Sequence, residues 1–194
     1  CPIGNVLFAT GRDGELHKQS NFMCFEETPS IYEEVLERWN PDLILFTSSN
    51  DVSQMVVDGE LLQTGSPEHL ARAEEAIWDA VSELTAQGAR AAFIEILPRG
   101  PGVTCLERDE PNIGTCTRDV DQPSQADAYN EIYRQVTLDN DAVAGVLELR
   151  DLVCPDEACP LAIDGVVVRY DGGHFTATWS ASLATVLDER LRLL

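Results

Sequence analysis

The sequence predicts one layered α/β domain that spans residues 1–194. Continuous apolar runs, which are typical of buried strands, alternate along the chain with segments whose apolar residues recur at helical spacing. With 194 residues the chain is long enough for one hydrophobic core and too short for two ordinary domains. Its 44% of apolar residues is the composition of a globular protein.

Five stretches are candidate strands. The run at 42–49 is continuously apolar, which predicts a strand buried on both faces of a parallel sheet. Residues 90–97 and 142–149 follow the same pattern, and a glycine ends a short apolar stretch at 6–10. Residues 163–169 indicate a turn followed by a strand.

Four segments are predicted helices, and the long segment between the second and third is a loop. Ser30 is the expected N-cap of the first helix, and Ser66 followed by Pro67 opens the second. The loop at 98–123 is rich in glycine, proline and charge, so we expect it to be stapled or functional. The predicted helices cover residues 30–39, 66–88, 124–138 and 176–193.

The charge of the chain excludes some partners. Thirty-four acidic against 13 basic residues give a net charge of -21. That field repels nucleic acid and anionic lipid surfaces, and no basic patch offsets it. We therefore expect no nucleic-acid partner. His17 and His69 stand alone in the sequence and are interpreted as surface or capping residues.

Six cysteines fall into three pairs that are close in sequence. Six cysteines allow fifteen connectivities, and pairing by proximity is favoured because short loops close at low entropic cost. The alternative is a metal site, but Cys154 and Cys159 would be only half of a zinc site, and the sequence offers no second half. Disulfides place the chain outside the cytosol. The expected pairs are Cys1 with Cys24, Cys105 with Cys116, and Cys154 with Cys159.

The segment Arg169–Thr178 carries the strongest catalytic pattern. Asp171 stands three residues before His174, with two glycines between them that allow the chain to fold back. A carboxylate on one ring nitrogen fixes the tautomer and leaves the other nitrogen free to take a proton from a nucleophile. The alternative is a tight turn in which Asp171 and Gly172 make the bend and His174 merely precedes the last helix.

A second candidate follows the strand at 42–49. Functional groups gather beyond the carboxyl ends of strands in open α/β sheets, so the Asn50 side-chain amide is a candidate oxyanion donor. An Asn or Asp that caps a strand-end turn is the equally common alternative.

Several segments together resemble a known family. The run CPDEACPLAIDGVVVRYDGGH, the ending DGGHFTATWSASLATVLDERL and the initial Cys-Pro resemble an SGNH-type (GDSL-like) hydrolase domain. The similarity extends to the extracytoplasmic domain that follows the membrane helices of acyltransferase-3 family O-acyltransferases. It covers essentially the whole chain and is most specific over residues 151–188.

The resemblance implies a fold, a chemistry and a location. The fold would be a flavodoxin-like three-layer α/β/α sandwich with a mostly parallel central sheet. Asp171 and His174 would be the acid and base of a Ser-His-Asp triad, with Asn50 at the oxyanion. The reaction would move an acyl (acetyl) group between an acyl donor and a polysaccharide or peptidoglycan acceptor, or to water, without a cofactor or a metal. The domain would lie outside the cytoplasm, tethered to a membrane acyltransferase domain of the same polypeptide.

One departure from the family pattern is decisive for activity. The nucleophile of the family stands in a Gly-Asp-Ser motif, and no Gly-Asp-Ser occurs in this sequence. We expect a segment before Cys1 to supply both the first strand and the serine, so that these 194 residues alone are inactive. The alternative is a non-catalytic, disulfide-stapled module that binds polysaccharide or protein, for which Trp39 and Trp179 are candidate contact residues.

Overall fold

A computed structural model of the protein shows two compact units, which we describe separately. The first unit comprises Cys1–Ile96 and Gln125–Val146, and the second comprises Leu97–Ser124 and Leu147–Leu194. The single domain expected from the sequence stays a prediction. The structure describes residues 7–9, 20–47, 54–57, 60–107, 113–120 and 124–194.

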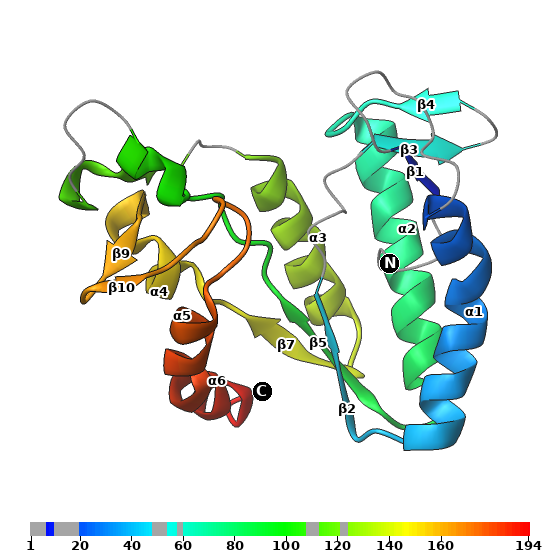
Figure 1. Cartoon of the computed structure of the whole chain (residues 1–194). Coiled ribbons are helices and arrows are strands. Elements are labelled where there is room, and N and C mark those ends of the chain that lie inside the picture. Colours follow the sequence, from blue (N-terminus) through cyan, green and yellow to red (C-terminus); the bar gives the residue numbers. More distant parts are fainter. Residues whose placement is uncertain (1–6, 10–19, 48–53, 58–59, 108–112, 121–123) are drawn as a thin grey trace. The chain divides into compact units, whose positions relative to one another are not determined.

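The first unit alternates strands and helices as its sequence predicts, except for two short strands at 54–57 and 60–62 that the sequence analysis did not predict (Figure 1). Its helices are α1 (Ser20–Trp39), α2 (Pro67–Thr85) and α3 (Gln125–Asp139). Its strands are β1 (Leu7–Ala9), β2 (Leu43–Phe46), β3 (Gln54–Val57), β4 (Glu60–Leu62), β5 (Arg90–Ile94) and β7 (Val143–Leu147).

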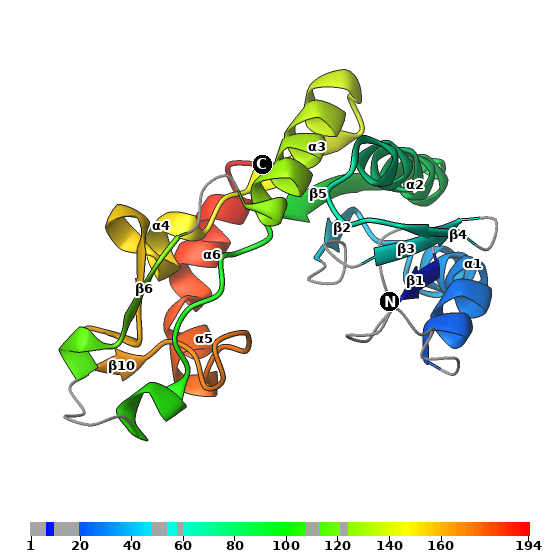
Figure 2. The same cartoon turned by 90° about the horizontal axis from the view of Figure 1, so that it is seen from above.

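The central sheet of the first unit has the order β2-β5-β7. Strands β2 and β5 run parallel, in a register that pairs Leu43 with Arg90 and Phe46 with Phe93. A second sheet, β1-β3-β4, is antiparallel and lies beside α1 (Figure 2). The predicted α/β class with a mostly parallel central sheet is confirmed.

The burial expected for β2 is wrong. Leu43 and Leu45 are 37% and 40% exposed, and within this strand only Phe46 is buried. Among the described strands β2 lies at the edge of its sheet, whereas β5 lies between two strands. The side chains of β2 are therefore less covered by neighbours than those of β5, where Ala91, Ala92 and Phe93 are fully buried.

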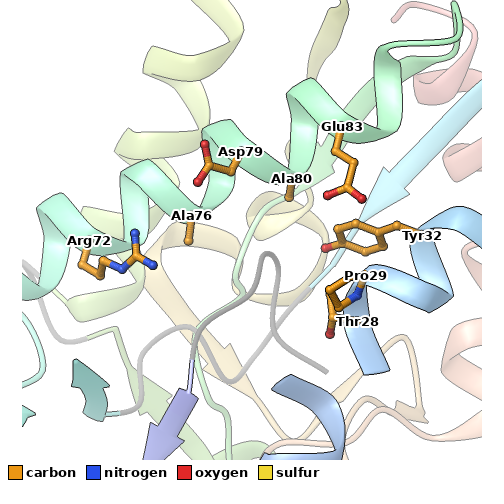
Figure 3. A pocket seen from close by; sticks show the side chains of 8 residues that line it. All are labelled: Thr28, Pro29, Tyr32, Arg72, Ala76, Asp79, Ala80 and Glu83. Atoms are coloured by element: carbon orange, nitrogen blue, oxygen red, sulfur yellow. The ribbon is translucent and has the colours of Figure 1, made fainter. Parts of the chain in front are cut away.

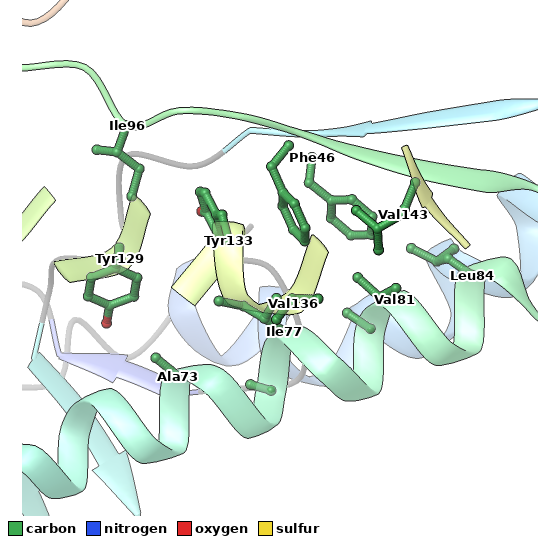
Figure 4. Close-up of a cluster of buried hydrophobic side chains, with 14 of the residues drawn as sticks. Phe46, Ala73, Ile77, Val81, Leu84, Ile96, Tyr129, Tyr133, Val136 and Val143 are labelled. Carbon is green, nitrogen blue, oxygen red and sulfur yellow. The ribbon is translucent and has the colours of Figure 1, made fainter. Parts of the chain in front are cut away.

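Helices α2 and α3 cover the central sheet with apolar side chains (Figure 4). The buried face of α2 recurs every three or four residues, which is the spacing of one side of a helix. Tyr133 of α3 stacks on Phe93 of β5, with ring centroids 4.5 Å apart and planes inclined by 5°. The buried residues of α2 are His69, Ala73, Ala76, Ile77, Ala80, Val81 and Leu84.

Helix α2 begins where the capping rules predict, and α1 does not. Ser66 caps α2, because its hydroxyl accepts the N–H of His69 and Pro67 occupies the first helical position. The expected N-cap Ser30 is wrong, since α1 begins at Ser20. The Ser30 hydroxyl instead donates to the carbonyl of Glu27 one turn earlier.

The second unit consists of short elements, which are shown with the rest of the chain in Figure 2. Its helices are η1 (Val103–Glu107), η2 (Ile113–Thr115), α4 (Arg150–Val153), η3 (Pro155–Glu157), α5 (Ala177–Ser182) and α6 (Ala184–Leu191). Its strands are β6 (Thr117–Asp119), β8 (Ala158–Pro160), β9 (Ala162–Ile163) and β10 (Val166–Val167), which form the antiparallel pairs β6-β8 and β9-β10.

Two disulfides staple the second unit. Cys105 is bonded to Cys116 and Cys154 to Cys159, with S–S distances of 2.10 and 2.04 Å. Cys154 and Cys159 are buried in a small apolar cluster with Val153, Val168 and Trp179. The third expected pair, Cys1 with Cys24, lies outside the residues whose side chains the structure describes.

The last predicted helix is interrupted. It divides at Leu183 into α5 and α6, and Thr176 caps its start by accepting the N–H of Trp179. Within this segment Trp179 is buried, whereas Leu183 and Leu187 are half-buried. Within the described part of the chain, no helix combines the length and the apolar character that crossing a membrane requires.

Candidate active site

The residues Asp171 and His174 lie on a tight bend of the second unit. Arg169 and Phe175 form an antiparallel bridge across the base of the bend, and the N–H of Tyr170 donates to the carbonyl of His174 over 2.9 Å. Gly172 turns the chain with φ +87°, a left-handed conformation that glycine adopts without strain. The bend therefore brings residues 171 and 174 onto the same short loop.

The two oxygens of Asp171 have different partners. Oδ1 accepts the backbone N–H groups of Gly173 at 3.0 Å and of His174 at 2.8 Å, which closes the turn. Oδ2 lies 2.7 Å from Nδ1 of the His174 ring. An ionised carboxylate can only accept, so in the neutral imidazole the proton lies on Nδ1 and Nε2 is left as an acceptor.

The same contacts stabilise the charge on Asp171. Hydrogen bonds from the His174 N–H, the His174 ring and the Gly173 N–H, in that order, hold the pKa of the Asp171 carboxyl well below its usual range. The carboxylate is therefore ionised at neutral pH and can accept a hydrogen bond from the imidazole.

The imidazole is open to solvent. The side chain of His174 is 83% exposed and that of Asp171 is 44% exposed. The ring is thus not held in apolar packing, and a reacting group can reach it. An exposed, carboxylate-backed imidazole is the arrangement that the motif Asp-Gly-Gly-His predicts.

The segment Pro98–Val103 lies against the bend and supports it. The N–H of Gly100 donates to the carbonyl of Gly172 at 3.1 Å, and that of Val103 to the carbonyl of Tyr170 at 2.9 Å. Gly102 forms an antiparallel bridge with Asp171. A Cβ at Gly102 would lie 2.8 Å from the Asp171 backbone, so this approach requires glycine.

Thr176, which caps α5, is hydrogen-bonded to the residues that precede the bend. The N–H of Thr176 donates to the carbonyl of Val168 at 3.0 Å, and its hydroxyl donates to the carbonyl of Val167. The same hydroxyl accepts the N–H of Trp179. The loop that carries His174 therefore lies between residues 167–168 and α5, which Thr176 joins by hydrogen bonds.

Asn50, the candidate oxyanion donor, lies outside the described residues, as do the neighbouring serines 48, 49 and 53. The part of the chain that the structure describes contains no group of three or more His, Cys, Asp or Glu side chains placed to hold a metal.

His69 is a buried residue that the sequence interpretation placed at the surface or at a cap. It lies in the first turn of α2 but is fully buried, with its ring within 3.4 Å of the Tyr129 hydroxyl. The N–H of Gly65 donates to its Nδ1 at 3.3 Å. Its spacing from Ala73 and Ala76 already places it on the apolar face of the helix, a signal that the sequence holds.

A pocket of about 190 Å³ lies elsewhere, between α1 and α2 of the first unit (Figure 3). Arg72 on its wall is ion-paired with Glu75, and Asp79 and Glu83 are one turn apart on α2. It contains no residue of the predicted site. Its lining residues are Thr28, Pro29, Tyr32, Arg72, Ala76, Asp79, Ala80 and Glu83.

Comparison with protein families decides what kind of domain carries the bend. A family model described as an SGNH domain, fused to AT3 domains, matches residues 1–189. The chain belongs to this family. The resemblance inferred from the cysteine run and the DGGH ending is confirmed, and this SGNH domain is of the kind associated with acyltransferases. A search of curated proteins finds no match to the chain.

Proposed function

We propose that this SGNH domain takes part in O-acyl, most simply O-acetyl, transfer to or from a cell-wall or surface polysaccharide outside the cytoplasm. The observation that carries the proposal is the 2.7 Å contact between Asp171 and an exposed His174 ring. The described disulfides support an oxidising compartment. Membership of a family fused to AT3 domains supports a membrane acyltransferase domain in the same polypeptide.

In this proposal His174 is the general base and Asp171 its orienting partner. A serine hydroxyl from a segment outside these 194 residues attacks the acyl carbonyl, and Nε2 of His174 takes its proton. The tetrahedral intermediate then expels the donor's leaving group, which receives that proton from His174. Asn50 and backbone amides hold the oxyanion in the meantime.

The second half-reaction uses the same imidazole. A sugar hydroxyl, or water, loses its proton to Nε2 and attacks the acyl-serine. The serine leaves and recovers its proton from His174. A sugar acceptor makes the protein an acetyltransferase, and water makes it a carbohydrate esterase. No cofactor enters either reaction.

The test is acyl transfer by the full-length protein with single substitutions at the bend. His174→Ala removes the base and is expected to lower kcat/KM by about 100- to 10,000-fold. Asp171→Asn is expected to lower it by a comparable factor, because the carboxamide can present an N–H to the ring and reverse the tautomer.

The matched control is Asp188→Asn on α6, which removes an exposed carboxylate of the same unit that pairs with Arg192 at 2.8 Å. Its activity should stay near that of the wild type. Unchanged activity in His174→Ala would overturn the proposed role of the bend.

The second candidate function is a non-catalytic binding module, which the exposed Trp39 favours. Trp39 stands at the end of α1 beneath the guanidinium of Arg38, with its ring on the surface. Trp179 is buried and offers no contact surface. If the His174→Ala protein keeps its function but Trp39→Ala loses polysaccharide binding, the module is the better description.

A further inference from the structure

Arg169 is a buried cation beside the candidate site. It precedes Asp171 by two residues and is only 1% exposed. Burial lowers the pKa of its guanidinium to about 10, so it remains charged at neutral pH. Burying a charge without an ionic partner is unfavourable, and no carboxylate among the described residues pairs with it.

The guanidinium of Arg169 contacts the segment Pro98–Gly100 and the ring of Phe175. Nη2 donates to the carbonyl of Pro98 at 2.7 Å, and the group lies over the ring of Phe175, 4.8 Å from its centroid. Nη1 packs against Gly100, where a Cβ would lie only 2.7 Å away. Nη1 has no hydrogen-bond partner in the described structure.

The segment that Arg169 holds is the same one that supports Asp171. From Pro98 the chain continues to Gly100, which bonds to Gly172, and to Gly102, which pairs with Asp171. The buried Arg169 side chain therefore connects both the segment Pro98–Gly102 and Phe175 to the residues that directly precede Asp171. Among the described residues, the Arg169 guanidinium donates to Pro98 and stacks on Phe175 and forms no ion pair with Asp171, so we expect it to act on the pair through this backbone.

We propose that Arg169 is a positioning residue for the Asp171–His174 pair. It fixes the segment Pro98–Gly102 against the bend and thereby sets the angle at which Oδ2 of Asp171 meets the imidazole. The planar, delocalised guanidinium can stack on Phe175 and donate in the same plane, which a lysine ammonium cannot do. This inference rests on the proposed function, because positioning has a measurable consequence only if the pair is catalytic.

The experiment is a double-mutant cycle in the full-length protein, with acyl transfer as the readout. Arg169→Met is expected to lower kcat by about 10- to 100-fold with KM changed less than twofold, because a small misplacement of a catalytic group slows the chemical step. Arg169→Lys should recover only part of this loss. In the Asp171→Asn background Arg169→Met should cause almost no further loss, since the carboxylate it orients is gone.

A purely structural role predicts a different pattern. The losses from Arg169→Met and Asp171→Asn would then multiply, and they would follow the folded fraction measured by thermal unfolding. That result, or wild-type kcat in Arg169→Met, would overturn the inference. Wild-type activity in Asp171→Asn would instead overturn the proposed function itself, so the two failures are distinguishable.

A second variant decides the question if Arg169→Met does not fold. Gly100→Ala keeps the arginine but adds a methyl group 2.7 Å from Nη1, at the movable end of the side chain. It should displace the guanidinium, fold normally and lower kcat in the same direction. Arg192→Met, at an exposed arginine of the same unit, is the control and should leave kcat unchanged. A folded Gly100→Ala protein with wild-type kcat would contradict the proposal.

Discussion

The two units of this domain are stabilised by different means. The first unit packs α2, α3 and β5 through apolar side chains, with Val81, Phe93 and Tyr133 fully buried. Among its described residues, the second unit has a small apolar cluster, two disulfides and a buried arginine. A short chain segment buries too little apolar surface to hold itself, so covalent links compensate. The Asp171–His174 pair lies in this second unit.

The comparison predicts that the largest losses of stability come from the core of the first unit. Phe93→Ala removes a ring that is fully buried and stacked on Tyr133, and we expect a loss of about 3–5 kcal/mol in the free energy of unfolding. Urea unfolding followed by circular dichroism measures it. Leu138→Ala, on the exposed side of α3, should change the free energy by less than about 0.5 kcal/mol. Equal losses would mean that this core does not hold the unit.

Removal of a disulfide should give the next largest effect, confined to the second unit. The Cys105–Cys116 bond spans 11 residues and the Cys154–Cys159 bond spans 5. Loop-closure entropy predicts losses of about 3 and about 2 kcal/mol for the paired Cys→Ser variants. Hydrogen exchange should show faster opening in the second unit while β5 and α2 stay protected. A loss of protection that is equal in both units would contradict the separation.

A glycine pair tests how closely the supporting segment approaches the bend. Gly172 and Gly165 both have positive φ, but a Cβ at Gly172 would meet the carbonyl oxygen of Gly100 at 2.7 Å, whereas a Cβ at Gly165 meets nothing within 4 Å. Each Gly→Ala change should destabilise the second unit, and Gly172→Ala should do so by about 1–2 kcal/mol more. Thermal unfolding of both variants gives the difference, and identical midpoints would show that the approach is looser than described.

The smallest expected effect is a change in acid stability. A carboxyl whose pKa is lower in the folded state stabilises that state above its unfolded pKa of about 3.9, and the stabilisation is lost as the pH falls toward the folded value. Asp171 is such a group. The second unit of the wild type should therefore weaken below about pH 4, and Asp171→Asn should weaken less over the same range.

Urea midpoints between pH 5 and pH 2 would measure this dependence, with Asp188→Asn as the control for the lost charge. A wild type and an Asp171→Asn protein with parallel pH profiles would show that the hydrogen bonds to Asp171 contribute no stability in solution.

Features that depend on neighbours in sequence were predictable. The Ser66–Pro67 start of α2 follows capping rules, and the contact between Asp171 and His174 spans only three residues. Apolar periodicity likewise identifies the helix–strand alternation of the first unit. The catalytic roles of Asp171, His174 and Asn50 stay predictions.

Features that depend on distant residues were not predictable. Arg169 contacts the carbonyl of a residue 71 positions earlier, and Gly102 packs on the backbone of Asp171. No local pattern encodes either contact, because the two segments are far apart in sequence and meet only in the folded structure. The exposure of β2 has the same origin, since it depends on which strands lie beside it and not on its own sequence.

The two oxygens of Asp171 have different partners, and this limits how the Asp171–His174 pair can be re-engineered. Oδ1 of Asp171 closes the turn and Oδ2 meets the imidazole, so one side chain determines both the backbone geometry and the orientation of the ring. Lengthening it by one methylene, as in Asp171→Glu, moves both oxygens at once. Attempts to retune this histidine by altering its acid will therefore also remodel the loop, and new activities are better sought by changing residues around the bend.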